Sequence, residues 1–95
     1  HLKAVPARGH SMEPRIRDGD LLLIDTAAKD IQNGEVYAIR DRGGRRVKRL
    51  FLSADGSLRI RSDNPAPQYA EEVYPADKLE QVEIIGRAVW LGGRI

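Results

Sequence analysis

Short apolar runs separated by turn dipeptides constrain the fold of this chain most strongly. Residues 21–24 form an apolar run that predicts a buried strand, and residues 35–40 form a second predicted strand directly after the turn pair Asn33-Gly34. Gly43-Gly44 then leads into residues 46–52, which predicts a β-hairpin. Because apolar runs of this length, bounded by turn residues, are typical of buried strands, the first half of the chain is expected to be β structure.

The second half of the chain continues this pattern. Asp55-Gly56 starts a turn into the alternating residues 57–62, and residues 82–91 form the longest predicted strand. Residues 64–67 contain two prolines, which lack the N–H that a strand ladder needs. Two segments are expected to form a helical turn at most, residues 27–31 and residues 75–79. We therefore predict an all-β fold, mostly antiparallel, with coiled sheets or a small distorted barrel and little helix.

Composition excludes several classes of protein. A chain of 95 residues suits a single domain, and its net charge of +2 is too small to indicate a nucleic-acid surface. There is no cysteine, and the two histidines, His1 and His10, are too few for a zinc site, so we expect no metal or cofactor. Since no apolar run approaches the roughly 20 residues of a membrane helix, a cytoplasmic location is expected.

A serine in a small-residue loop and a lysine in an apolar run suggest a nucleophile and its base. Ser11 follows Gly9-His10, and Lys48 lies in a predicted strand on the same face as Leu50 and Leu52. A serine hydroxyl needs a base to become a nucleophile, and a lysine can serve if burial lowers its pKa towards neutrality. The alternative is that Lys48 lies on a solvated face with its arginine neighbours and that Ser11 only forms a turn.

Six segments taken together resemble the LexA-like serine peptidase family, the C-terminal Ser–Lys dyad domain of LexA, phage repressors and UmuD-like proteins. The segments occur in the family's order, and the separation of Ser11 from Lys48 is also typical of the family. They are Gly9-His10-Ser11-Met12-Glu13-Pro14, Asp18-Gly19-Asp20-Leu21-Leu22, Asn33-Gly34-Glu35-Val36, Val47-Lys48-Arg49-Leu50, Ser62-Asp63-Asn64-Pro65 and Ile85-Gly86-Arg87-Ala88-Val89.

This resemblance implies a role for each member of the site. Ser11 would be the nucleophile and Lys48 the general base, with the oxyanion held by the backbone N–H groups of His10 and Ser11. Proteins of the family cut a peptide bond in their own interdomain linker, and a RecA–single-stranded-DNA filament promotes the cut. They also form homodimers, and operator DNA is bound only through a separate N-terminal domain.

The resemblance also divides the chain. Residues 1–8 are expected to be a linker remnant or residues from cloning, and residues 9–95 the peptidase and dimerisation domain, with the helix-turn-helix domain absent from this chain. Three alternatives stay open: a non-cleaving dimerisation module of a phage repressor, a UmuD-like protein, and a signal-peptidase-like enzyme. Against the last, Lys48-Arg49 is followed by Leu50-Phe51-Leu52 and not by the glycine- and proline-rich continuation of signal peptidases.

Several neighbouring side chains are given simpler roles. His10 stands where aspartate is common in the family and is interpreted as an exposed loop residue, and Met12 is expected to pack beneath the loop. Trp90 is expected either in the core or at a dimer contact. Arg45, Arg46 and Arg49 are interpreted as a solubilising rim.

Overall fold

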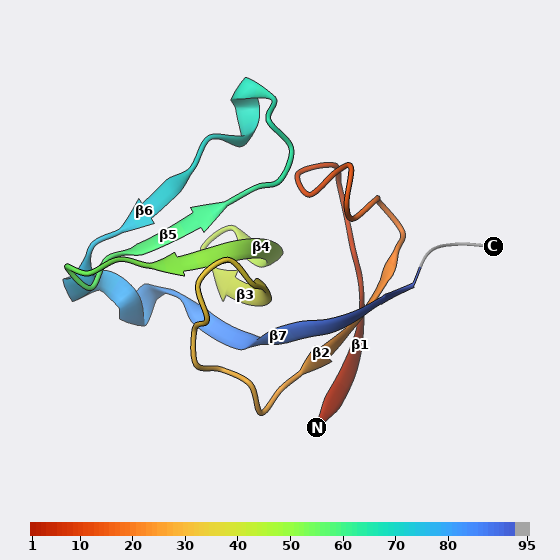
Figure 1. Cartoon of the computed structure of the whole chain (residues 1–95), viewed down its shortest axis with the longest axis horizontal. Coiled ribbons are helices and arrows are strands. Elements are labelled where there is room, and N and C mark those ends of the chain that lie inside the picture. The colour runs from red at the N-terminus through yellow and green to blue at the C-terminus, as the bar shows by residue number, and fades with distance from the viewer. Residues whose placement is uncertain (93–95) are drawn as a thin grey trace.

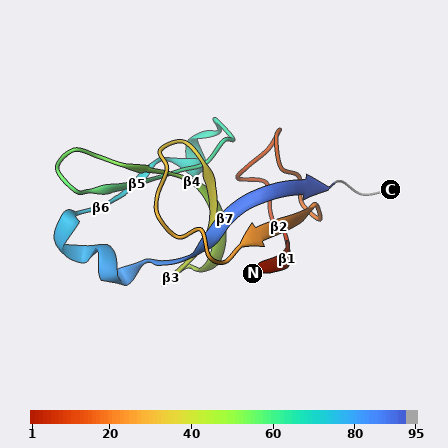
Figure 2. The same cartoon turned by 60° about the horizontal axis from the view of Figure 1, so that its bottom comes forward.

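Strands of one antiparallel sheet make up most of the molecule. The structure, a computed structural model, describes residues 1–92, and within them the strands follow the order β1-β2-β7-β3-β4-β5-β6 across the sheet. Figures 1 and 2 show β7 crossing the middle of the molecule, with β1 and β2 at one end and β5 and β6 at the other. The prediction of an all-β fold is confirmed. The strands are β1 (Leu2–Pro6), β2 (Leu21–Asp25), β3 (Val36–Asp41), β4 (Gly44–Leu52), β5 (Leu58–Arg61), β6 (Glu72–Tyr74) and β7 (Glu83–Gly92).

Two short 3-10 helices complete the secondary structure of the described residues, η1 (Pro67–Tyr69) and η2 (Ala76–Gln81). The second confirms the helical turn expected at residues 75–79. The turn expected at residues 27–31 is wrong, because these residues are not helical. The Asp25 carboxylate instead accepts the Ala27 N–H, and this local bond offers the backbone an alternative to the helix.

Strand β1 occupies residues that were expected to be a linker remnant. It pairs antiparallel with β2 at one edge of the sheet, with Val5 opposite Leu22. Val5 is almost completely buried, whereas the other residues of β1 are exposed. An edge strand with a single buried side chain has almost no hydrophobic signal in its sequence, which explains why the pattern did not predict it.

The buried side chains form two clusters on the two faces of β3. Successive side chains of a strand point to opposite faces, so Ala38 enters one cluster while Tyr37 and Ile39 enter the other. The first cluster also contains Met12 and Ile16, which come from the loop between β1 and β2. This loop carries Ser11, and the core therefore anchors it from below.

The β2 and β3 strands flank β7 and both contain a register irregularity against it. Close to one of these irregularities, Gly86 of β7 approaches β2. A Cβ atom added to Gly86 would lie 2.2 Å from the carbonyl oxygen of Asp25. Only a residue without a side chain fits there, because neither backbone can move without breaking the pairing of β2 with β7.

We expect Gly86→Ala to lower the free energy of unfolding by about 2 to 3 kcal/mol, since the clash is with backbone. Gly44→Ala is the matched control, because a Cβ there meets nothing within 4 Å and only the φ of +88° is unfavourable. The control should lose about 1 kcal/mol. Urea denaturation of both variants measures the difference, and equal losses would show that the close approach does not constrain β7.

Candidate active site

Ser11 lies in a tight turn that several hydrogen bonds hold in place. Gly9 has a φ of +80°, which favours glycine, and its N–H donates to the Asp18 carboxylate at 2.8 Å. Within the turn the Glu13 N–H donates to the carbonyl of His10. Met12, the next residue after Ser11, is buried beneath the turn as predicted. The buried Met12 and the Asp18 bond thus fix the turn from two sides and leave Ser11 half-buried at its surface.

Lys48 lies inside the sheet and not on a solvated face. It sits on β4 opposite Tyr37 of β3, and only 7% of its surface is exposed. Its Nζ donates a hydrogen bond of 2.8 Å to the hydroxyl of Ser62, which follows directly after β5. The neighbouring Leu50 is completely buried on the same face, so strand alternation placed this lysine correctly.

Burial lowers the pKa of Lys48 below its ordinary value, because an ammonium is poorly solvated there. The positive charge of Arg46, two residues away on the same face of β4, lowers this pKa further. The carboxylates of Glu72 and Asp41 act in the opposite direction. The net effect of these groups is a lowered pKa, which makes the neutral amine, the form that can accept a proton, easier to reach than in an exposed lysine.

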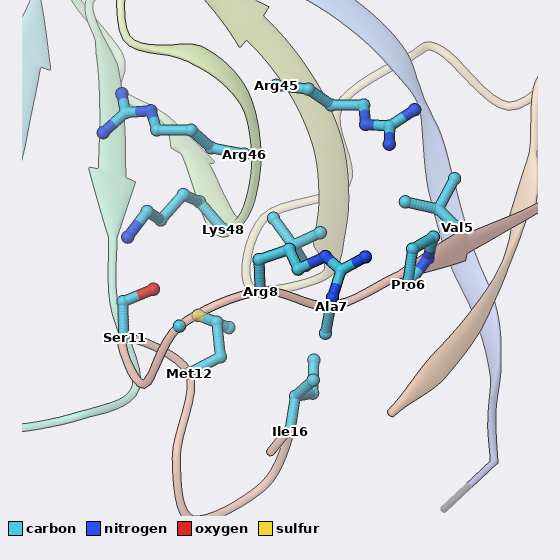
Figure 3. Close-up of a pocket in the computed structure, with 12 residues that line it drawn as sticks. Val5, Pro6, Ala7, Arg8, Ser11, Met12, Ile16, Arg45, Arg46 and Lys48 are labelled. Atoms are coloured by element: carbon cyan, nitrogen blue, oxygen red, sulfur yellow. The ribbon is translucent and has the colours of Figure 1, made fainter. Parts of the chain in front are cut away.

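Ser11 and Lys48 line the same pocket, which has a volume of about 310 Å³. Figure 3 shows the two side chains directed towards one another from opposite walls, with Met12 beside Ser11. The wall formed by β1 and the turn is largely apolar and includes Val5, Ala7 and Ile16. A hydroxyl, an amine and an apolar wall around one cavity suit a reaction in which the amine takes the hydroxyl proton.

The backbone N–H groups of His10 and Ser11 are the donors that the sequence predicted for an oxyanion. Within residues 1–92 neither N–H donates a hydrogen bond to another group. Their own carbonyl oxygens, in contrast, both accept hydrogen bonds from Asn64. The arrangement leaves two donors for a ligand, although their role in binding stays a prediction.

Two of the three arginines assigned to a solubilising rim have other partners. Arg46 is held by ion pairs of 2.6 Å to Asp41 and 2.7 Å to Glu72, and Arg49 binds both carboxylate oxygens of Asp63. Only Arg45 among the three is exposed. The interpretation was wrong for Arg46 and Arg49 because their partners come from other strands and loops, which a local charge pattern does not reveal.

Other predicted residues lie at the surface. The His10 side chain is 64% exposed, as expected, and the hydrogen bond that its Nδ1 makes to the Glu13 carboxylate raises its pKa. Trp90 is 53% exposed, which excludes it from the core and leaves the dimer contact as its predicted role.

Two residues near the pocket were missed as members of the site, Ser62 and Asn64. Both lie in the segment Ser62-Asp63-Asn64-Pro65, where Ser62 was expected to end a strand, Asn64 to begin a proline-containing loop, and neither was assigned to the site. A serine and an asparagine close to two prolines read as an ordinary loop, and only the fold shows what they contact.

Within the described part of the chain no group of histidine and acidic side chains could hold a metal ion. The same residues include no helix long and apolar enough to cross a membrane.

Replacing Lys48 by methionine should increase stability at neutral pH, by about 1 kcal/mol, because a buried amine is exchanged for an apolar chain. The folded-state pKa of Lys48 is the lower one, so the unfolded chain binds more protons and the wild type gains stability as pH rises towards 10.5. The advantage of Lys48→Met should therefore shrink between pH 7 and pH 10 in urea denaturation. The exposed Lys29, replaced in the same way, is the control and should show no such trend. If Lys48→Met were more stable than the wild type by the same amount at pH 7 and pH 10, burial would not lower the pKa of Lys48.

Comparison with known proteins finds one family and several bacterial and phage regulators that are similar to this chain. The Peptidase S24-like family model matches residues 1–89. The chain is 40% identical over 83 residues to the HTH-type transcriptional regulator PrtR of Pseudomonas aeruginosa, covering 86% of this chain and 32% of that protein. It is 42% identical over 85 residues to Repressor protein CI of Enterobacteria phage phi80, covering 90% of this chain and 34% of the repressor.

An HTH-type transcriptional regulator of Haemophilus influenzae is 31% identical over 86 residues, covering 90% of this chain and 35% of the regulator. The chain thus spans about a third of the length of the curated relatives it matches. The family model matches nearly all of the chain, and the all-β sheet is consistent with it. This chain belongs to the Peptidase S24-like family.

Proposed function

We propose that this chain is the C-terminal domain of a LexA-like or phage-type transcriptional repressor, and that it cuts the repressor's own interdomain linker as a Ser–Lys peptidase. The observation that carries the proposal is the burial of Lys48 in the pocket that Ser11 also lines. The relatives support the proposal that this chain is one domain of a longer repressor. The regulator PrtR and the phage repressor are each about three times as long as the stretch that they share with this chain.

The reaction would begin with the neutral amine of Lys48. The Ser11 Oγ attacks the carbonyl carbon of the linker peptide bond while its proton passes to Nζ of Lys48. The backbone N–H groups of His10 and Ser11 stabilise the tetrahedral oxyanion. The C–N bond then breaks, and the ammonium of Lys48 returns a proton to the leaving amine.

Hydrolysis of the resulting ester completes the cycle. Lys48 takes a proton from a water molecule that attacks the acyl carbon, and the proton is passed on to Ser11 as the ester bond breaks. The free serine and a new carboxyl end are the products. The same amine acts as base and then as acid in both halves, so a single buried lysine replaces the histidine and aspartate of other serine peptidases.

The proposed partners follow from the family and from the surface. A RecA–single-stranded-DNA filament is the proposed inducer, and operator DNA would be bound by another part of the protein in the cytoplasm. For a homodimer, the supporting feature is a group of exposed apolar side chains at the carboxyl end of β7 and the start of β2. These are Leu21, Val89, Trp90 and Leu91.

The first test uses the full-length protein, incubated from pH 7 to pH 10 and analysed by mass spectrometry. The cleavage rate should rise with pH and level off below pH 10.5, because burial lowers the pKa of Lys48. Ser11→Ala and Lys48→Met should each reduce the rate by at least about a thousandfold. A full-length protein that stays intact throughout would favour the non-cleaving dimerisation module, and cleavage that persists in both variants would reject the Ser–Lys mechanism.

The second test concerns the dimer. Sedimentation equilibrium at several concentrations should show a mass of twice 10.6 kDa for this chain, and Trp90→Ser should shift the equilibrium towards the monomer. The exposed Leu52 lies on another strand, so Leu52→Ser is the matched control and should leave the dimer unchanged. A strict monomer at high concentration would remove dimerisation from the proposal.

A further inference from the structure

Asn64 connects the turn that carries Ser11 to the loop that follows β5. Its backbone N–H donates to the carbonyl of Ser11 at 2.9 Å, and its side-chain Nδ2 donates to the carbonyl of His10, also at 2.9 Å. Its Oδ1 accepts the N–H of Ala66 at 3.0 Å, which fixes the side chain itself. Figures 1 and 2 both show the two loops side by side, although they are far apart in the sequence.

The two carbonyls belong to the two peptide groups on either side of Ser11. A peptide group is planar, so its C=O and N–H directions are linked. Holding the carbonyl of His10 fixes the direction of the Ser11 N–H, and holding the carbonyl of Ser11 fixes the next peptide plane. The two planes together determine φ and ψ of Ser11, and therefore the direction of the Cα–Cβ bond from which its hydroxyl extends.

The same short segment also contacts Lys48. Ser62 accepts the hydrogen bond from Nζ of Lys48, while Asp63 binds the guanidinium of Arg49 through both carboxylate oxygens at 2.9 and 2.8 Å. Asp63 lies at a bend of the chain between Ser62 and Asn64, directly after the end of β5. The ion pair of Asp63 thus fastens the segment to β4, and the residues before and after it contact the amine and the serine turn.

We propose that Asn64 is a positioning residue, which holds both peptide groups flanking Ser11 and so keeps the hydroxyl and the N–H of Ser11 directed into the pocket at Lys48. This inference rests on the proposed function of that pocket. Asn64 does not touch the linker in this role, and it acts only through Ser11.

The chain offers a matched control in Asn33. Its Nδ2 donates to the carbonyl of Leu52 and its Oδ1 accepts the N–H of the same residue, so it also joins two backbone segments through its side chain. Leu52 is the last residue of β4 and lines no part of the pocket. Asn33→Ala therefore removes a similar pair of hydrogen bonds away from the site.

The first measurement is the pH–rate profile of self-cleavage in the full-length protein. Asn64→Ala should slow cleavage about 10- to 100-fold, because a small misplacement of a nucleophile is costly. The pH midpoint should not move, since Lys48 keeps its burial and its bond to Ser62. Asn33→Ala should cleave within about twofold of the wild-type rate. An Asn64→Ala rate equal to that of Asn33→Ala would overturn the inference.

The second measurement does not depend on cleavage. In the 95-residue chain, ¹⁵N relaxation should give a Ser11 amide order parameter near 0.85 for the wild type and Asn33→Ala, and a value falling towards 0.6 for Asn64→Ala. Asn64→Leu, which keeps the bulk without the polar atoms, replaces the alanine variant if that one does not fold. An unchanged order parameter overturns the positioning role. If the wild type never cleaves but its Ser11 amide loosens in the Asn64 variant, the proposed function fails while the positioning role stands.

Discussion

The structure depends on the burial of one amine in a β-sheet. Lys48 extends from β4 between β3 and the segment after β5, and the hydroxyl of Ser62 is the group that its Nζ binds. No carboxylate forms an ion pair with it among residues 1–92, so an ammonium there is poorly compensated, and burial lowers the pKa of Lys48 below its ordinary value. The nearest carboxylates, Asp41 and Glu72, are occupied by Arg46.

The pair of acidic residues on Arg46 serves two purposes at once. It binds both terminal nitrogens of the guanidinium, and it occupies carboxylates that could otherwise pair with Lys48. Tyr74 donates a further hydrogen bond to Asp41, so the cluster is held by β3, β4 and β6 together. A strand at the edge of the sheet thus contributes to the electrostatics of a residue two strands away, which gives β6 a function beyond covering the core.

Local patterns in the sequence predicted those structural features that a single strand or hairpin determines. The turn dipeptides located the β3–β4 hairpin, and alternation placed Lys48 on the face of the buried Leu50. They did not predict β1, which buries only Val5, or the ion pairs of Arg46 and Arg49. Each of these depends on which strand lies beside which, and the order of strands in a sheet is a property of the whole chain.

The candidate site also combines features that local patterns predict with features that need the whole fold. The serine and the lysine could be chosen from residue chemistry and the resemblance, whereas Asn64 needed the structure, because 54 residues separate it from the His10 carbonyl that it binds. Such a distant contact requires that β5 pairs with β4 and that the loop after β5 reaches the serine turn. The Ser11 conformation is therefore tied to the completed sheet, and an unfolded or partly folded chain would carry both reactive groups without holding them together.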